Sequence, residues 1–286
     1  MHNIVFLLGD SQKARNDNHQ RLPQAFQALG WQVTLADHDS VRLHAGEVRI
    51  GVANAATFQL IWPLGFGRQA TFMDRVQLLD LIDATKFVTA PRALALLHGK
   101  FRWSQYMPPT HASSDLNALT EVLRSGGDWV LKPTAGSYAE GVRLIRAGDD
   151  PMLALQALGG ADPAGRGYVI AQRFLPEVAS GETRTLVAGG KIVGSYLRVP
   201  SDGLRASLAA GGVAQPTTVD EEQLQTIKAI ATELGDLGAH FAAIDLVGHQ
   251  LIEVNIANPG GLETLGALYG GNFAERAAQH MIARLI

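Results

Sequence analysis

Cysteine is absent from this chain, and its absence excludes several kinds of chemistry. The 286 residues contain no Cys, so disulfide bridges, thiolate metal sites and a cysteine nucleophile are ruled out. No apolar run approaches the length that crosses a bilayer, and the start of the chain has no basic leader before an apolar segment. We therefore expect a cytoplasmic protein without a membrane partner.

Strong net charge is also missing. The formal net charge is −3 at pH 7, so the composition gives no basic footprint for holding nucleic acid through its phosphates, and we expect no nucleic-acid partner. Local positive sites stay possible. The chain does have apolar material, at 47% of its residues. This is enough for a sizeable core, and the length suggests about two domains.

The first part of the chain alternates strand-like and helix-like segments, which is typical of an α/β domain with a parallel sheet. We expect strands at residues 3–8, 31–36, 58–64 and 87–89, and helices at residues 19–29 and 70–82. The alternation ends at Pro91. The boundary of this βαβ domain is therefore expected between Ala90 and Lys100.

The rest of the chain predicts two lobes of α+β type. The first lobe would hold a helix at residues 116–123 and strands at residues 129–132 and 141–145. The second would hold strands at residues 168–174, 183–188 and 191–198, and helices at residues 221–234, 260–268 and 273–285. A capping box formed by Thr218 and Glu221 is expected to begin the helix at 221.

Residues 241–255 predict a β-hairpin that carries acids. Two strands rich in Val, Ile and Leu flank a short turn at Gly248. Because side chains alternate along a strand, Glu253 and Asn255 share a face, and Asp245 lies opposite residue 252 or 253. A divalent cation would offset the repulsion between two such carboxylates. The pattern predicts a Mg²⁺ site, and ordinary solvated acids on an exposed hairpin remain the alternative.

Two further segments have the character of anion sites. Lys132 ends a strand and precedes a turn of small residues at 133–141, whose backbone N–H groups suit phosphate. That turn matches neither the P-loop nor the dinucleotide fingerprint, so a hairpin tip with an exposed lysine stays possible. Arg198 and Arg205 flank a loop of small residues that suits closure over an anion. Solvated arginines on a long loop are the alternative.

In this order, these segments resemble the ATP-grasp ligases, and among them the bacterial glutathione synthetases. The resemblance is strongest at residues 171–176, 181–187, 198–212, 244–248 and 253–259. It implies an ATP-grasp fold in which two lobes sandwich ATP. The implied domains are an N-terminal parallel-sheet domain at 1–97, a small lid subdomain at 98–166, and a C-terminal subdomain with the Mg-ATP site at 167–286.

The resemblance also implies a role for particular residues. ATP would be bound by Lys100, Lys132, Ser137, Gln172, Arg173, Phe174, Leu175 and Glu177. Mg²⁺, or Mn²⁺ in its place, would be held by Asp245, Glu253 and Asn255. The acyl phosphate or the substrate carboxylates would be bound by the catalytic arginines Arg184, Arg198 and Arg205. Further substrate contacts would come from Ser207, Asn258, Gly260 and Gly261.

The activity implied by the resemblance is ATP-dependent joining of a small-molecule acid to an amine through an acyl phosphate, in a homodimer or homotetramer. The chain departs from the glutathione synthetase pattern at residues 62–68, at Ser207 and at residues 258–262. These are substrate-binding regions, so the identity of the acid and the amine stays open. Two other functions also stay open: a grasp-fold kinase that stops at phosphoryl transfer, and a nucleotide-binding regulatory protein without turnover.

Overall fold

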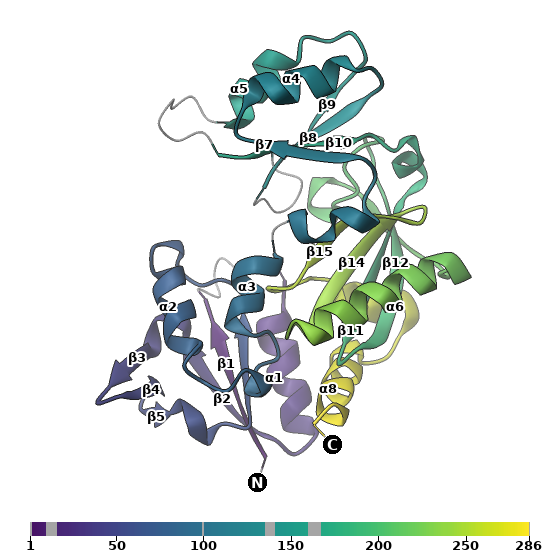
Figure 1. Cartoon of the computed structure of the whole chain (residues 1–286). Coiled ribbons are helices and arrows are strands. Elements are labelled where there is room, and N and C mark those ends of the chain that lie inside the picture. Colours follow the sequence, from purple (N-terminus) through teal and green to yellow (C-terminus); the bar gives the residue numbers. More distant parts are fainter. Residues whose placement is uncertain (1, 10–15, 99, 135–140, 160–166, 286) are drawn as a thin grey trace.

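The computed structural model of the protein describes residues 2–9, 16–98, 100–134, 141–159 and 167–285. Three units are visible in it: an N-terminal unit, a lid, and a C-terminal unit built on the largest sheet (Figure 1). Ser137, predicted to bind ATP, lies outside the described residues. In the part of the chain that is described, no helix is both long and apolar enough to cross a membrane.

The N-terminal unit contains the parallel sheet that was predicted. Its strands are β1 (Asn3–Leu8), β2 (Gln32–Asp37) and β6 (Leu60–Leu64), in the order β2-β1-β6. Its helices are α1 (Asn18–Ala28), α2 (Phe72–Leu79) and α3 (Pro91–Leu97). A small antiparallel sheet that was not anticipated is formed by β3 (Val41–His44), β4 (Glu47–Ile50) and β5 (Ala53–Asn54). The strand expected at residues 87–89 is wrong, because Phe87 and Thr89 make only isolated bridges.

The lid is a four-stranded antiparallel sheet with its own core. Its strands are β7 (Thr110–Ser113), β8 (Trp129–Pro133), β9 (Arg143–Ile145) and β10 (Val169–Arg173), in the order β7-β10-β8-β9, and its helices are α4 (Leu116–Arg124) and α5 (Pro151–Gly159). The prediction that β10 belongs to the C-terminal lobe is wrong. Residue pattern identifies a strand but not its partner, and β10 pairs with β7 and β8.

The C-terminal unit is a five-stranded antiparallel sheet covered on both faces. Its strands are β11 (Glu182–Ala188), β12 (Lys191–Val199), β13 (Val213–Pro216), β14 (Phe241–Val247) and β15 (Gln250–Asn255), in the order β13-β12-β11-β14-β15. One face is covered by α6 (Glu221–Asp236), and the other by α7 (Leu262–Tyr269) and α8 (Phe273–Ala283). The capping box of α6 is Asp220 with Gln223. The predicted pair Thr218 and Glu221 is wrong, because the three-residue spacing of a capping box occurs twice between Thr218 and Gln223, and the structure uses the second pair.

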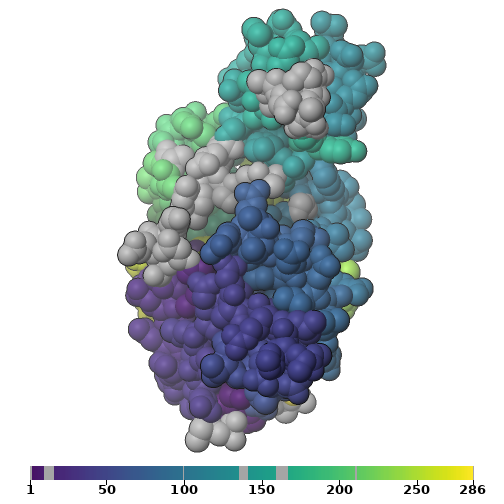
Figure 2. All heavy atoms as spheres, turned by 90° about the vertical axis from the view of Figure 1, so that its left-hand side faces the viewer, coloured from purple at the N-terminus to yellow at the C-terminus, as the bar shows by residue number. Residues whose placement is uncertain are grey.

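The N-terminal and C-terminal units share one core, whereas the lid stands apart. The ring of Trp62 lies 5.3 Å from that of Phe6 and 5.2 Å from that of Phe241, and all three side chains are fully buried. Among the described residues, the lid core consists only of residues between Leu116 and Ala171. Figure 2 shows the N-terminal third of the chain as the lower body and the lid standing above it. The lid is therefore the unit that is freest to move relative to the other two.

Candidate functional site

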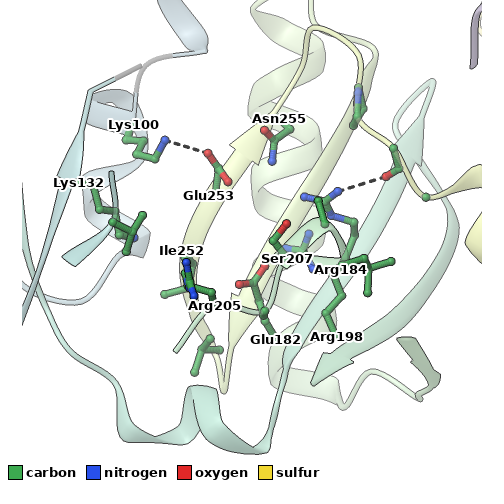
Figure 3. A pocket seen from close by; sticks show the side chains of 18 of the residues that line it. Lys100, Lys132, Glu182, Arg184, Arg198, Arg205, Ser207, Ile252, Glu253 and Asn255 are labelled. Atoms are coloured by element: carbon green, nitrogen blue, oxygen red, sulfur yellow. Dashed lines mark hydrogen bonds and ion pairs between the residues drawn. The ribbon is translucent and has the colours of Figure 1, made fainter. Parts of the chain in front are cut away.

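A cleft of about 620 Å³ lies where the three units meet. The lid contributes one wall through β8 and β10, the C-terminal sheet contributes the opposite wall through β11, β12 and β15, and the N-terminal unit closes one end. Figure 3 shows the two walls, with Lys100 and Lys132 facing Glu253 and Asn255. The predicted site residues that line the cleft are Lys100, Lys132, Gln172, Arg173, Phe174, Leu175, Arg184, Arg198, Arg205, Ser207, Glu253, Asn255, Asn258, Gly260 and Gly261.

The charged wall is one face of the five-stranded sheet. Strand register places Tyr196, Arg184, Asp245 and Glu253 in a single row across β12, β11, β14 and β15. Because side chains alternate, the same face continues along β11 as the apolar Leu186, which is buried against α7 and α8. The face is therefore apolar under the helices and charged beyond them, where the cleft begins.

Asp245 lies in the middle of this row and is fully buried. Arg184 donates from Nε and Nη2 to its two carboxylate oxygens at 2.8 and 2.6 Å, and Arg198 donates from Nη2 at 2.9 Å. Burial acts to raise the pKa of Asp245, but the two guanidinium groups outweigh it and hold that pKa below its usual value. Asp245 is not among the residues that line the cleft. Its predicted role as a metal ligand stays a prediction, because both carboxylate oxygens already accept hydrogen bonds from arginines.

Glu253 and Asn255 do reach the cleft. Register places Glu253 opposite Asp245, which is one of the two positions that the hairpin pattern predicted. The Glu253 carboxylate accepts a bond from the Lys100 ammonium at 2.8 Å. Burial acts to raise the pKa of Glu253, and Lys100 more than offsets this, so the pKa is lowered and the group is ionised at neutral pH. Among the described residues, no three His, Asp or Glu side chains cluster as a metal site. One or two carboxylates and an amide suit Mg²⁺ when phosphate oxygens complete its shell.

Lys132 supplies a buried positive charge on the lid wall. Its side chain is 8% exposed, and its ammonium donates to the Gln172 carboxamide oxygen at 2.6 Å. Gln172 in turn donates to the Thr110 hydroxyl at 3.0 Å, which fixes its orientation. Burial lowers the pKa of Lys132 to about 8, with Glu253 opposing the shift and Lys100 adding to it. The strand geometry thus holds a titratable cation inside the cleft.

Next to Lys132 the cleft becomes apolar. This part is lined by Val130, Phe174, Leu175 and Val178. These apolar side chains suit the binding of a flat ring, and residues 173–175 line the same part of the cleft. Arg173 also lines it and lies over the Trp129 ring at 3.9 Å. Glu177, predicted to line the same pocket, is exposed in the short helix η7 (Pro176–Ser180) and is not among the lining residues.

Several lining residues were not predicted, and some of them carried a signal. Glu182 lies two positions before Arg184, and Tyr196 two before Arg198, so strand alternation places both on the charged face. Glu182 is buried and ion-paired with Arg198. Phe66 follows the carboxyl end of a parallel strand, which is a common place for binding residues. Other lining residues, such as those at the start of α1, carry no local signal.

Comparison with known proteins identifies the family. The family model described as "Prokaryotic glutathione synthetase, ATP-grasp domain" matches residues 96–270, which is more than half of the chain. The chain belongs to this family. The match begins near the end of α3 and runs through α7, so it includes the lid and almost the whole charged wall of this ATP-grasp protein.

Individual relatives agree with the family. The glutathione synthetase of Synechocystis sp. is 31% identical over 205 residues, covering 70% of this chain and 63% of that protein. The glutathione synthetase of Parasynechococcus marenigrum is 34% identical over 184 residues, covering 64% of this chain and 59% of that protein. The matched part of the ATP-grasp chain therefore spans less than two thirds of either relative's length.

Solved structures establish the fold over the full length. D-cycloserine synthetase DcsG superposes with a TM-score of 0.72 at 20% identity, covering 99% of this chain and 100% of that chain. The ATP-grasp ligase PsnB complexed with a minimal precursor superposes with a TM-score of 0.71 at 14% identity, covering 99% of both chains. The predicted ATP-grasp fold is confirmed.

Proposed function

We propose that this protein is an ATP-dependent ligase that joins a carboxylate to an amine. The observation that carries the proposal is the convergence of opposite charges in one cleft. Lys100 is ion-paired with Glu253, and Lys132, Arg184 and Arg198 line the same cleft. Such an arrangement suits a polyphosphate, a divalent cation and a second anion side by side. Membership of the ATP-grasp family of glutathione synthetases supports the same function.

ATP is proposed to lie with its base in the apolar slot beside Phe174 and its phosphates toward Lys100 and Lys132. Mg²⁺ or Mn²⁺ would be held by Glu253 and Asn255, with Asp245 as the predicted third ligand, and when bound it would neutralise phosphate charge. Glu253 is ionised and faces the cleft, so it fits this role. The ion pair with Lys100 at 2.8 Å would hold this carboxylate beside the proposed phosphate positions.

The proposed reaction has two steps. An oxygen of the substrate carboxylate attacks the γ-phosphorus, ADP leaves, and an acyl phosphate forms. The amine nitrogen then attacks the carbonyl carbon, the C–O bond to phosphate breaks, and the nitrogen loses a proton as the amide forms. Arg184, Arg198 and Arg205 line the cleft, and we propose that they stabilise the charge on the transferred group. The chain has no cysteine, and this chemistry needs no covalent enzyme nucleophile.

The test is a substrate screen that measures ADP and product mass together. It begins with γ-glutamylcysteine and glycine and continues through other acid and amine pairs. We expect equal amounts of ADP and amide, each dependent on both substrates. A phosphorylated acid that persists with every amine would instead identify a kinase. Nucleotide binding without ADP formation for any pair would identify a regulatory protein.

A variant separates the enzyme functions from the regulatory one. Glu253→Gln keeps the shape of the side chain and removes its charge, and we expect ligation to fall by at least about 100-fold. Glu222→Gln, an exposed acid on α6, is the matched control and should keep full activity. Equal activity of the two variants would contradict the proposed metal site.

The proposal extends to assembly and location. We propose a homodimer or homotetramer in the cytoplasm, as the family resemblance implies. Light scattering of the purified protein measures the mass, and a monomer alone would contradict this assembly. Fractionation of cells that express the chain tests its location.

A further inference from the structure

Every backbone carbonyl of residues 257–260, the segment that follows β15, has a hydrogen-bond donor. Residues 257–260 present four consecutive carbonyl oxygens, and each accepts a hydrogen bond from a different group. The donors, in order, are the Gly65 backbone N–H at 2.9 Å, the Asn16 side chain at 3.1 Å, the Asn18 side chain at 2.9 Å and the Arg184 guanidinium at 3.3 Å. Three of these four donors come from the N-terminal unit, more than 190 positions away in the sequence.

Asn18 makes the most buried of these contacts. It is the first residue of α1 and is 1% exposed. Its side-chain nitrogen donates to the backbone carbonyl of Pro259 and also to the Asn258 side-chain oxygen at 2.8 Å. Both hydrogens of the amide group are therefore directed at the same short segment. A buried amide that loses such partners leaves unsatisfied acceptors behind, so the arrangement favours one conformation of the segment.

Residues 257–261 form one end of the cleft. Gly260 and Gly261 line it, and neither has a side chain. The Gly260 carbonyl accepts from Arg184, and the Gly261 carbonyl accepts from the Leu265 N–H at 2.9 Å. The carbonyl groups of both glycines therefore have fixed hydrogen-bond partners. The position of this end of the cleft depends on how residues 257–260 are held.

We propose that Asn18 is a positioning residue for substrate binding, which holds residues 257–261 from the N-terminal unit in the conformation that receives the substrate. The inference rests on the proposed ligase function and assigns part of its substrate affinity to α1. Asn18 does not line the cleft itself, so it acts through Asn258 and Pro259. The nucleotide end of the cleft is built from the lid and β15, so nucleotide affinity does not depend on Asn18.

The experiment replaces Asn18 by Leu, which has a similar volume and no donor. With two hydrogen bonds lost, the fraction of molecules with a correctly held segment falls, and KM for the acid or the amine rises by about tenfold. We expect kcat and the Kd of an ATP analogue to stay within about twofold of the wild-type values. Such a split between KM and nucleotide affinity would not follow from general destabilisation.

Hydrogen–deuterium exchange gives a readout that does not need turnover. In Asn18→Leu, the amides of residues 260–262 should exchange faster, while those of β8 should be unchanged. The matched control is Asn3→Leu, because Asn3 also bridges two segments of the N-terminal unit, donating to the Thr57 carbonyl at 3.0 Å and accepting from the Gln59 N–H at 2.8 Å. That control lies away from the cleft and should change neither KM nor the exchange of residues 260–262.

The outcomes separate the inference from the function on which it rests. An active wild type with unchanged KM and unchanged exchange in Asn18→Leu overturns the positioning role. A wild type without turnover on any substrate pair rejects the ligase function. In that case faster exchange at residues 260–262 still supports the positioning role, and unchanged exchange overturns it. If Asn18→Leu does not fold, Asn18→Ser is measured in the same way, with the same outcomes deciding.

Discussion

From the lowered pKa of Lys132 we predict that nucleotide binding weakens as the pH rises from 7 to 9. The side chain is buried in the lid wall and bonded to Gln172. Burial disfavours the charged ammonium and lowers its pKa from 10.5 to about 8. Lys132 therefore loses its proton within a range in which an exposed lysine keeps it. The neutral amine has no charge to offer a phosphate, so affinity should fall as the pH passes 8.

The size of the effect follows from the pKa. The charged fraction of a group with a pKa of about 8 falls from about 0.9 at pH 7 to about 0.1 at pH 9. If only the ammonium form of Lys132 binds phosphate, the Kd for an ATP analogue rises about tenfold over this range. At pH 9 the bound phosphate also draws a proton onto Lys132, so binding should take up about 0.9 proton at pH 9 and about 0.1 at pH 7.

Isothermal titration calorimetry with a non-hydrolysable ATP analogue and Mg²⁺ measures both quantities, because proton uptake appears as a dependence of the heat on the buffer. In Lys132→Met the affinity should be low and independent of pH. Lys228→Met, on the exposed face of α6, should behave as the wild type. The reasoning is refuted if the wild-type Kd is the same at pH 7 and pH 9, or if Lys132→Met keeps the pH dependence.

Three further predictions follow from the charged wall and its surroundings. Asp245→Asn removes the carboxylate that pairs with Arg184 and one of the two carboxylates that pair with Arg198, and should lower the free energy of unfolding by about 3–5 kcal/mol in urea titrations. Asp202→Asn, in an exposed arginine pair, should lower it by less than about 1 kcal/mol. Gly261→Ala should lower the free energy of unfolding by about 1–3 kcal/mol. The reason is that φ of Gly261 is +137° and the new Cβ would lie 3.1 Å from Tyr196. Gly260→Ala is the control: its Cβ would meet only ordinary contacts, so the loss should be smaller in the same titration. Chelation of divalent cations should abolish ADP formation, and added Mg²⁺ or Mn²⁺ should restore it; unchanged turnover in EDTA would contradict the metal role.

The hairpin at residues 241–255 shows which parts of the site can be predicted from the local sequence pattern. Alternation and a short turn were enough to place Asp245 opposite residue 252 or 253, and the register decides for Glu253. Alternation also put Asn255 on the same face as Glu253. These relations depend only on neighbours along the chain and across one turn. The same holds for the parallel sheet, whose strands and α1 were found close to their expected bounds.

Relations between distant segments were not predictable from pattern. Nothing in the sequence around Asp245 shows that Arg184 and Arg198 would occupy its oxygens, because those arginines come from two other strands. The strand β10 was recognised, but its partners were not. The contact of Asn18 with Pro259 joins segments about 240 positions apart. In each case the decisive information is which surfaces pack together.

The shared core of the N-terminal and C-terminal units has a consequence for synthesis of the chain. Phe6 and Trp62 are made early, yet the ring that covers Trp62 is Phe241, about 180 residues later. At typical translation rates of about 5–20 residues per second, this delay is roughly 10 to 35 s. During that time the sheet face that carries Phe6 and Trp62 is covered by α1 but not by the C-terminal unit. The nascent N-terminal unit should therefore be the part of the chain most dependent on chaperones.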